Sequence, residues 1–270
     1  MFTMSENYGS MNIQEQKILV QLAENHVSIT QRQLAALSSQ SLGVVNKAIR
    51  SLIEKELVDT KYRVTQKGYH LLEDKKPKRA IILAAGFGLR MIPINTEIPK
   101  GLLEVKGERL IERIIRQLHK KGIFEIYVVV GFLKEKYEYL IDLFGVELIA
   151  NMSYASKNNL HSLFAAQDHL EDAYIIPCDV WVKDNPFKTY ELYSWYMVTD
   201  ALSRRSPLGI TRDGFLIPVP SNGREMVGIA FFSKVDAVTL RNEMKLLVND
   251  ERFDTHFWED ALILENSLKV

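Results

Sequence analysis

The sequence lacks several features that would mark a secreted or membrane protein. Its 270 residues contain one cysteine, Cys178, which excludes an intrachain disulfide framework and suits a reducing compartment. No apolar run reaches the length of about twenty residues that spans a bilayer. The first residues show no charged-then-apolar signal pattern. We therefore expect a cytoplasmic protein that does not use a membrane as a partner.

The sequence also lacks an excess of charge of either sign. Lysine plus arginine and aspartate plus glutamate both number 34, so no global field would draw the whole chain to nucleic acid. The hydrophobic content of 47% can bury a large core. Residues 73–78, EDKKPK, have the composition of a linker. We therefore expect two domains, 1–76 and 77–270.

The first domain has the element order of a small DNA-binding module. Apolar periodicity and turn residues predict helices at 13–24, 31–37 and 44–53, two short strands at 57–60 and 62–65, and a helix at 68–72. This order, together with the stretch TQRQLAALSSQSLGVVNKAIRSLIEKELV, resembles the winged helix-turn-helix of MarR-like regulators. The resemblance implies DNA as a partner through residues 30–65, with Asn46, Lys47 and Arg50 on a recognition helix.

The charge of this module favours DNA binding only weakly. Residues 1–78 hold eleven Lys or Arg and eight Asp or Glu, whereas DNA readers usually have a denser basic face. The alternative is a dimerisation or regulatory module whose charges are solvated. A homodimer is therefore a second partner that the sequence leaves open.

The second domain alternates buried-strand and helical patterns. We expect strands at 80–84, 124–131, 146–151 and 174–178, helices at 110–121, 134–144 and 162–169, antiparallel strands at 195–198 and 228–232, and helices at 235–248 and 257–266. Such alternation indicates an α/β, Rossmann-like fold with a doubly wound, mostly parallel sheet. Ligands in these sheets bind beyond the carboxyl ends of the strands, where we expect the chemistry.

A turn of small residues follows the first strand of this domain. It reads Ala84-Ala85-Gly86-Phe87-Gly88, with Arg90 and Lys100 downstream. Small residues let the backbone approach a ligand closely, and successive N–H groups form a concavity that suits an anion. The turn matches neither G-x-G-x-x-G nor the P-loop. A tight strand-to-helix turn in an ordinary α/β domain is the alternative.

Taken as a whole, residues 83–105 resemble the signature of nucleotidyltransferases that activate sugar and alcohol phosphates. That signature is L-A-A-G-x-G-[ST]-R-[LM] followed by P-K-x-L-[LV], and Leu89 departs from it because a Ser or Thr is usual there. The resemblance implies a nucleotide-diphospho-sugar transferase-like fold and catalytic roles for Arg90 and Lys100. It implies a nucleotide bound by Leu83, Ala84, Ala85, Gly86, Phe87 and Gly88.

An acidic residue ends the fourth strand. Asp179 follows the apolar run YIIPC, so its carboxylate should face the ligand crevice, where it can hold Mg²⁺ against phosphate oxygens. The alternative is that Asp179 only caps the next helix. A second metal ligand is expected from Trp258-Glu259-Asp260.

Residues 78–270 further resemble the bacterial CTP:phosphocholine cytidylyltransferases. The family's Y-N-N-x-x-S-L segment corresponds to 157–163, with Lys157 in place of Tyr, which implies that Asn158, Asn159 and Ser162 bind the nucleotide. Its W-[FY]-L-V, G-[VI]-[SA]-F-W and Y-W-D segments correspond to 195–198, 228–232 and 257–259. The last of these favours Glu259 over Asp260 as the second metal ligand beside the catalytic Asp179.

Four aromatic residues on these segments suggest how a substrate would be held. A quaternary ammonium group has no N–H to donate, and proteins hold it against aromatic faces by cation–π attraction. Trp195, Phe232, Phe257 and Trp258 are the candidate walls of such a cage. The alternative is that each of them fills the core.

These residues together predict a cytidylyltransferase that condenses CTP and phosphocholine to CDP-choline and pyrophosphate, with Mg²⁺ as cofactor. The alternatives are a sugar-1-phosphate nucleotidyltransferase and a winged-helix transcription regulator whose second domain only senses a ligand. Residues 267–270 read as the start of a further strand, so we expect either a shortened chain or the front portion of a longer polypeptide.

Overall fold

The structure is a computed structural model and describes residues 11–25, 29–86, 97–204, 206–211 and 216–263. The chain divides into two compact units, Met1–Lys76 and Pro77–Val270, which we name the N-terminal unit and the C-terminal unit. The division falls within the charged segment 73–78. Among the described helices, none is long and apolar enough to cross a membrane.

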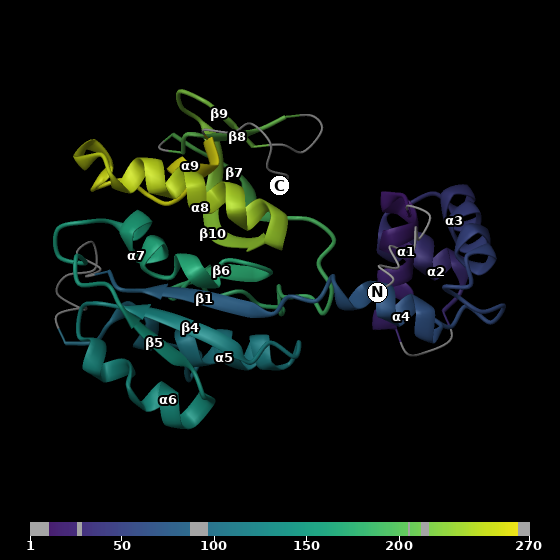
Figure 1. The fold of residues 1–270 in the computed structure, drawn as a ribbon, viewed down its shortest axis with the longest axis horizontal. Helices are drawn as coiled ribbons and strands as arrows, with labels where there is room; N and C mark the ends of the chain where they lie inside the picture. The colour runs from purple at the N-terminus through teal and green to yellow at the C-terminus, as the bar shows by residue number, and fades with distance from the viewer. Residues whose placement is uncertain (1–10, 26–28, 87–96, 205, 212–215, 264–270) are drawn as a thin grey trace, which may run out of the picture. The chain divides into compact units, whose positions relative to one another are not determined.

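The N-terminal unit is a small helical unit with capped helices (Figure 1). Its helices are α1 (Ile13–Glu24), α2 (Gln31–Ser38), α3 (Leu42–Glu54) and α4 (Gln66–Glu73). Asn12 and Thr30 each form a capping box, in which the cap side chain and the third helical residue satisfy each other's backbone N–H groups. Ile18, Leu19 and Leu52 are fully buried between the helices. The expected helices are therefore present.

The two strands expected at 57–60 and 62–65 are reduced to a single antiparallel bridge, Val58–Val64. The Asp59 carboxylate accepts the backbone N–H groups of Lys61 and Arg63 at 2.8 and 2.9 Å. Tyr62 has a positive φ of 63°. The backbone hydrogen bonds Asp59 N–H to Arg63 O and Thr65 N–H to Leu57 O flank this tight turn, so the hairpin is present but short.

The C-terminal unit is built on one six-stranded sheet in the order β5-β4-β1-β6-β10-β7 (Figure 1). Its strands are β1 (Arg79–Ala84), β4 (Glu125–Val130), β5 (Glu147–Ala150), β6 (Ala173–Pro177), β7 (Trp195–Ser203) and β10 (Gly223–Phe232). The first four strands pair in parallel, and β10 pairs antiparallel with both β6 and β7. The predicted antiparallel extension is thus part of the main sheet.

Helices cover both faces of this sheet. The helices are α5 (Leu110–His119), α6 (Tyr139–Phe144), α7 (Asn159–Ala165), α8 (Lys234–Val248) and α9 (Asp260–Ile263). Residues of α5 and α6 bury against Ile82 and Val128, whereas those of α7, α8 and α9 bury against Ile81 and Val129. Successive residues of a strand point to opposite faces, so β1 and β4 supply both cores. The doubly wound, mostly parallel sheet predicted from the sequence is present.

Shorter elements complete the unit and correct several predicted bounds. They are the 3₁₀ helices Lys100–Leu102, Lys134–Tyr137, Gln167–His169 and Glu251–Phe253, and two hairpins, β2 (Glu104–Val105) with β3 (Glu108–Arg109) and β8 (Leu208–Ile210) with β9 (Leu216–Pro218). The helix expected at 134–144 begins instead as a 3₁₀ turn after Leu133, which has a φ of 50°. The helix expected at 162–169 begins at Asn159, because Asn158 caps it, and ends at Ala165. The helix expected at 257–266 begins at Asp260, and its residues after Ile263 lie outside the described part.

Candidate functional site

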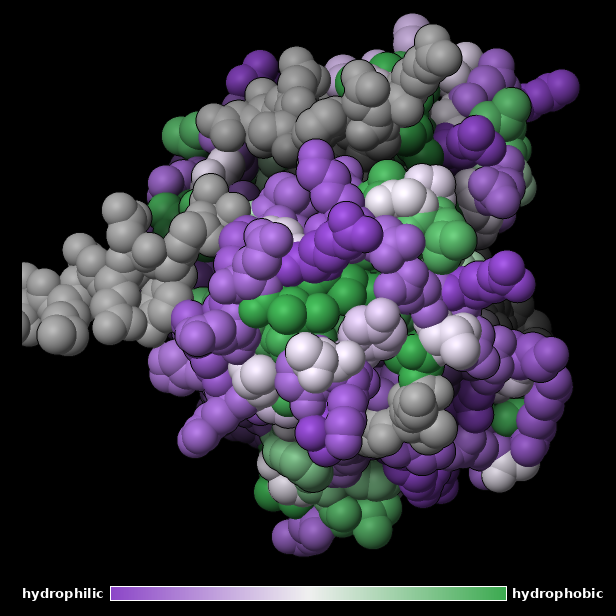
Figure 2. Space-filling view, turned by 90° about the vertical axis from the view of Figure 1, so that its right-hand side faces the viewer, coloured by the Kyte–Doolittle hydropathy of each residue, from purple (hydrophilic) through white to green (hydrophobic). Residues whose placement is uncertain are grey.

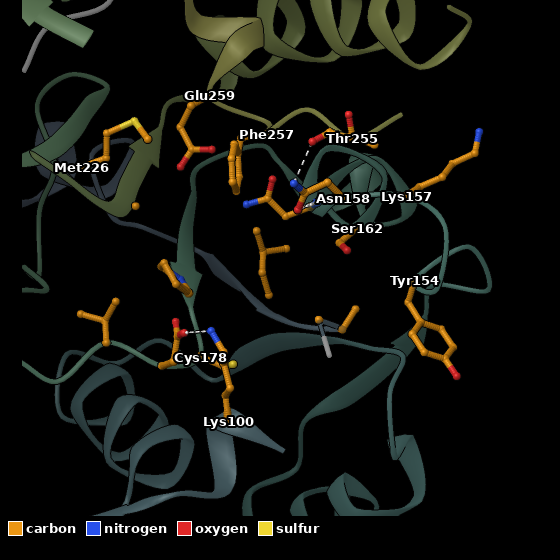
Figure 3. Close-up of a pocket in the computed structure, with 18 of the residues that line it drawn as sticks. Lys100, Tyr154, Lys157, Asn158, Ser162, Cys178, Met226, Thr255, Phe257 and Glu259 are labelled. Atoms are coloured by element: carbon orange, nitrogen blue, oxygen red, sulfur yellow. Dashed lines mark hydrogen bonds and ion pairs between the residues drawn. The ribbon is translucent and has the colours of Figure 1, made fainter. Parts of the chain in front are cut away.

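A cavity of about 820 Å³ lies beyond the carboxyl ends of β1 and β6 (Figure 3). One wall, which we name the α7 side, includes Tyr154, Lys157, Asn158, Asn159 and Ser162. The opposite wall, which we name the β10 side, consists of Met226, Val227, Gly228, Phe257 and Glu259. Leu83, Ala85, Gly86, Lys100 and Asp179 lie at the strand ends between these walls. The size and position are those expected for a small-molecule site in a doubly wound sheet.

Lys100 and Asp179 form an ion pair at the centre of the cavity, with 2.9 Å between Lys100 Nζ and Asp179 Oδ2. Asp179 lies two residues after the end of β6, and Lys100 opens a 3₁₀ turn that packs against the same strand end. Gly101 allows this contact, because an added Cβ would lie 3.1 Å from both the Cys178 Cβ and the Tyr137 hydroxyl oxygen. Burial raises the pKa of the Cys178 thiol, so Cys178 is a neutral packing residue here.

The α7 side is formed by close packing of the chain that follows the ends of β1, β4 and β5. Gly131 leaves no room for a side chain, because an added Cβ would lie 2.6 Å from the Tyr154 Cβ and 2.8 Å from the Ala85 carbonyl oxygen. The buried Asn151 amide donates a hydrogen bond of 3.0 Å to the Ser162 hydroxyl. Because Ser162 accepts this bond, its own hydrogen can be donated to a ligand in the cavity.

The β10 side depends on an irregularity in its strand. The register between β10 and β7 shifts between Met226 and Ala230, and Gly228 within this bulge has a φ of 86°. A Cβ at Gly228 would lie 2.7 Å from the Pro177 Cγ. β-Bulges re-aim side chains next to active sites. The bulge and its glycine therefore bring residues 226–228 to the cavity.

Glu259 is a buried carboxylate with one free oxygen at the cavity wall. Tyr196, which is fully buried, donates a hydrogen bond of 3.1 Å to Glu259 Oε1. Glu259 Oε2 is also buried and has no hydrogen-bond partner among the described residues, and the side chain points into the cavity in Figure 3. Burial, the largest cause, raises the pKa of Glu259 to about 7. A buried unpaired carboxylate oxygen is a site for a cation.

Two carboxylates of the cavity, one at the strand ends and one on the β10 side, could hold a divalent cation such as Mg²⁺. Asp179 and Glu259 line the cavity, and hard divalent cations prefer carboxylate and phosphate oxygens. In the described part of the chain, no group of three or more His, Cys, Asp or Glu side chains could hold a metal by itself. A Mg²⁺ ion at this site would therefore share its coordination with the phosphates of a ligand.

Most of the residues predicted for the nucleotide and the catalysis meet in the cavity. Those that line it are Leu83, Ala85, Gly86, Lys100, Asn158, Asn159, Ser162, Asp179 and Glu259. Ala84 does not line it, because alternation along β1 turns its side chain into the core. Phe87, Gly88 and Arg90 lie outside the described residues.

The expectation that four aromatic residues form a cage is wrong. Of these four residues, only Phe257 lines the cavity. Phe232 and Trp258 are buried in the core against each other, with ring centroids 6.2 Å apart. Trp195 packs on the other face of the sheet, where its ring contacts Tyr174 at 6.0 Å. The period of two along β7 separates Trp195 from the neighbouring Tyr196, which faces Glu259.

Sequence reasoning did not single out several residues of the site. Tyr154, Met226, Val227 and Thr255 carry no motif signal, and only the glycine of the 228–232 segment hinted at the bulge. Tyr196 likewise carries no signal of its role beside Glu259. The function of its hydroxyl depends on a contact 63 residues away in the chain, which no local pattern reveals.

Comparison with known proteins identifies the family. Residues 80–187 match the MobA-like NTP transferase domain, and residues 11–59 match the winged helix-turn-helix DNA-binding domain. A 2-aminoethylphosphonate cytidylyltransferase from Lancefieldella rimae is 33% identical over 192 residues, which cover 68% of this chain and 78% of that protein. The chain belongs to the cytidylyltransferase family. A choline-phosphate cytidylyltransferase from Streptococcus pneumoniae is 42% identical over 110 residues, 41% of this chain and 48% of that protein.

The fold and the family agree. The solved structure of the CTP:phosphocholine cytidylyltransferase from Streptococcus pneumoniae has a TM-score of 0.63 and 30% identity, covering 68% of this chain and 83% of that one. The nucleotidyltransferase fold and the N-terminal winged helix-turn-helix predicted from the sequence are confirmed. The match to the MobA-like domain ends at residue 187, so it includes Asp179 and the α7 side but not the β10 side.

Proposed function

We propose that this cytidylyltransferase family member transfers CMP from CTP to a small zwitterionic phosphate, with phosphocholine as the expected acceptor, giving CDP-choline and pyrophosphate. One observation carries the proposal: the Lys100–Asp179 pair lies in one cavity between the Gly86 turn and the wall that holds Phe257 and Glu259. Both substrates of an in-line displacement can therefore meet at the strand ends. The position of the pair between the two walls suits the α-phosphate of the nucleotide.

The reaction needs no enzyme nucleophile. A phosphate oxygen of the acceptor attacks the α-phosphorus of CTP, a new P–O bond forms, and the bond to the β-phosphate oxygen breaks to release pyrophosphate. The chain's part is positioning and charge neutralisation. Lys100 would stabilise the charge that develops on the phosphoryl oxygens, with Arg90 in the same role by resemblance. Ser162 would donate its hydroxyl hydrogen to the nucleotide.

Mg²⁺ is the proposed cofactor, and Asp179 and Glu259 are its proposed protein ligands. When bound, the ion would neutralise phosphate charge. Lys100 pairs with Asp179, and Glu259 Oε2 has no hydrogen-bond partner among the described residues. Both carboxylates thus have oxygens available to a cation at the cavity.

The acceptor has a second candidate, 2-aminoethylphosphonate. The match to the Lancefieldella rimae enzyme, whose name specifies this compound, covers 78% of that protein. The described β10 side presents one aromatic residue, Phe257, and one carboxylate, Glu259, to the cavity. A primary ammonium group can donate hydrogen bonds to a carboxylate, so this pair suits it better than a closed aromatic cage would. Phosphocholine would rely on Phe257 and the apolar Met226 and Val227 for its trimethylammonium group.

The test is pyrophosphate release with Mg²⁺ and each of four nucleoside triphosphates. The acceptors are phosphocholine, 2-aminoethylphosphonate, phosphoethanolamine and glucose 1-phosphate. Turnover confined to CTP with phosphocholine is the expected result, and CTP with 2-aminoethylphosphonate would select the second candidate. Turnover only with glucose 1-phosphate would overturn the acceptor assignment and make the protein a sugar-1-phosphate nucleotidyltransferase. No turnover with any pair would overturn the enzymatic proposal and favour the ligand-sensing regulator.

DNA is the proposed partner of the N-terminal unit through residues 30–65. The exposed Arg32, Lys47, Arg50 and Lys61 form no ion pair within the described residues, whereas Lys55 pairs with Glu15 at 2.7 Å. Leu37, Leu42 and Val44 are exposed beside them on α2 and α3. Figure 2 shows hydrophobic side chains among hydrophilic ones on one face of the protein. A recognition helix with free cations and apolar side chains suits phosphates and thymine methyl groups.

Salt-dependent binding to duplex DNA would test this partner. Changing Lys47 and Arg50 to Gln should weaken binding and lower the dependence on salt by about two counterions. The pair Lys75→Gln and Lys76→Gln is the matched control, because these cations lie at the end of the unit. Equal affinity of the Lys47/Arg50 variant and the unaltered chain would contradict DNA binding at this surface.

A further inference from the structure

Two segments that are almost one hundred residues apart in the chain are fastened together at the top of the cavity. The first is 157–161, at the start of α7, and the second is 254–258, between α8 and α9. The Asn158 backbone N–H donates to the Asp254 carbonyl oxygen at 2.7 Å, and its side-chain amide donates to the Thr255 carbonyl oxygen at 2.9 Å. The Asn159 side-chain oxygen accepts the Trp258 backbone N–H at 3.0 Å. We name this set of contacts the clasp.

Asp254 is the charged centre of the clasp. Its Oδ1 lies 2.9 Å from Lys157 Nζ and 3.1 Å from His161 Nε2. The Asp254 side chain is one-quarter exposed, and Oδ1 itself is buried. One carboxylate oxygen therefore lies against two nitrogen groups, one from Lys157 just before α7 and one from His161 in its first turn. Such a convergence holds the second segment at one place along the first.

The second segment has no other regular structure to hold it. Residues 254–259 lie between a 3₁₀ turn (Glu251–Phe253) and the short helix α9, and they belong to no strand. Outside a ladder, the backbone polar groups of this segment need other partners, and the clasp supplies them to the carbonyls of Asp254 and Thr255 and to the N–H of Trp258. The residues that the segment brings to the cavity are Thr255, Phe257 and Glu259. Figure 3 shows Asn158 and Thr255 joined above the cavity, with Phe257 and Glu259 beside them.

The polar atoms of the two asparagines are therefore largely occupied by protein. Asn158 Nδ2 binds the Thr255 carbonyl, and Asn158 Oδ1 accepts the Asn159 backbone N–H at 2.8 Å. Asn159 Oδ1 binds the Trp258 N–H. The two side chains line the cavity, but their hydrogen bonds lead to the segment that carries Phe257 and Glu259.

We propose that Asn159 and Asp254 are positioning residues for acceptor transfer: through the clasp they set Phe257 and Glu259 against the acceptor, and they are not nucleotide ligands. This inference rests on the proposed cytidylyl transfer. A displacement of about 1 Å at a reacting centre can cost about 10²-fold in rate, so the clasp can control transfer without touching a substrate. The clasp also joins the α7 side to the segment of the β10 side that carries Phe257 and Glu259.

The kinetic test compares Asn159→Ala and Asp254→Asn with Asp250→Asn. Asp250 is a part-exposed acid of the same region whose side chain pairs with Arg252 outside the cavity, so its change matches the charge lost at Asp254. We expect kcat/KM for the acceptor to fall about 10²-fold in both clasp variants. The affinity for CTP, measured by equilibrium dialysis in EDTA, should change less than about twofold, and Asp250→Asn should behave as the unaltered chain does. A loss of CTP affinity with unchanged acceptor kinetics would overturn the proposal.

A second measurement does not depend on activity. Amide hydrogen exchange of residues 254–259, without substrates, should be faster in Asn159→Ala and Asp254→Asn than in Asp250→Asn, while exchange in the central strands β1 and β4 stays slow. Unchanged exchange in the segment would overturn the clasp. If the unaltered chain transfers no cytidylyl group but exchange responds as expected, the proposed function fails and the clasp stands. Lys157→Arg should retain the slow exchange, and Lys157→Met should lose it in part.

Discussion

The two walls of the cavity are built in different ways. The α7 side comes from chain that follows the ends of neighbouring strands, and it lies within the residues that match the MobA-like domain. The β10 side comes from a bulged strand and from an irregular segment near residue 259, both beyond that match. The proposed nucleotide wall thus follows from the sheet itself, whereas the proposed acceptor wall depends on contacts that must be made across the fold.

This difference has a physical origin. In a parallel sheet all carboxyl ends meet at one edge, so Gly86 and Asp179 come together as soon as β1 pairs with β6. No such rule places Phe257 or Glu259. They reach the cavity on a segment that the clasp joins to the start of α7, and Tyr196 binds the Glu259 carboxylate. The proposed acceptor side can therefore vary without a change in the Lys100–Asp179 pair at the strand ends.

The largest effect should follow from removing the ion pair that both walls share. Lys100→Ala takes away the cation nearest the strand ends, so we expect turnover to fall by about 10²–10³-fold with every acceptor. Asp179→Ala should cause a loss of the same order, because it removes a proposed ligand of Mg²⁺. Both losses are measured as kcat for pyrophosphate release at saturating substrates.

The controls for this pair are Lys134→Ala and Asp184→Asn. Both residues are exposed, and neither has an ion pair within the described residues. All four variants should keep the unfolding midpoint of the starting protein within a few degrees. A near-normal kcat in Lys100→Ala or Asp179→Ala would remove these residues from the proposed mechanism.

The second effect concerns the buried carboxylate of the β10 side. Burial raises the pKa of Glu259 from 4.5 to about 7, so the folded chain holds a proton there that the unfolded chain releases above pH 4.5. The folded state therefore loses stability as the pH rises from 4.5 to 7, and the full penalty remains above pH 7. Glu259→Gln removes it. The gain in stability should be near zero at pH 4.5 and about 3 kcal/mol at pH 8.

This gain is measured in EDTA by tryptophan fluorescence during denaturation. All three tryptophans, Trp181, Trp195 and Trp258, lie in the C-terminal unit, so the signal reports that unit alone. Asp260→Asn is the control, because its carboxylate is more exposed and lies beside His256 at 2.7 Å. An equal gain at pH 5 and pH 8 would show that the Glu259 carboxylate does not titrate in this range.

The third effect tests the β10 side by itself. Phe257→Ala removes the one aromatic face that the described β10 side presents to the cavity. For an acceptor with a quaternary ammonium, the loss of a cation–π contact should raise the acceptor KM about tenfold. The KM for CTP should stay within about twofold of its value in the unaltered chain. Phe124→Ala is the control, since that ring is 64% exposed and does not line the cavity.

An unchanged acceptor KM in Phe257→Ala would mean that the ammonium group is held elsewhere, as by Glu259. With 2-aminoethylphosphonate the effect of this variant should be smaller, because a primary ammonium can donate hydrogen bonds to a carboxylate. The ratio of the two effects therefore distinguishes the acceptor candidates.

The sequence alone predicts the α7 side far better than the β10 side. The alternation of strands and helices and the position of Asp179 lead directly to the strand-end site. The prediction of an aromatic cage was wrong because neighbouring residues of one strand motif face opposite sides of the sheet. Trp195 and Tyr196 are such neighbours. Glu259 was found by resemblance, whereas its hydrogen bond to Tyr196 needed the folded structure.

The two asparagines show the same limit in another form. A motif at 157–163 indicated that Asn158 and Asn159 belong to the site, and both line the cavity. The motif does not reveal which atoms they bind, because their partners lie at Thr255 and Trp258, close to one hundred residues away. A sequence motif therefore predicted the location of these residues, and their bonding depends on a long-range contact.

The smallest effect should come from the α7 side, through Ser162. Its hydroxyl accepts the Asn151 amide at 3.0 Å, which directs its hydrogen toward the cavity. If that hydrogen is donated to the nucleotide, Ser162→Ala should raise the KM for CTP about fivefold and leave the acceptor KM unchanged, since one neutral hydrogen bond contributes about 1 kcal/mol. Ser221→Ala, at an exposed turn, is the control. A rise of both KM values together would instead show a general loosening around the buried Asn151. The opposite responses of Ser162→Ala and Phe257→Ala would establish that each wall binds its own substrate.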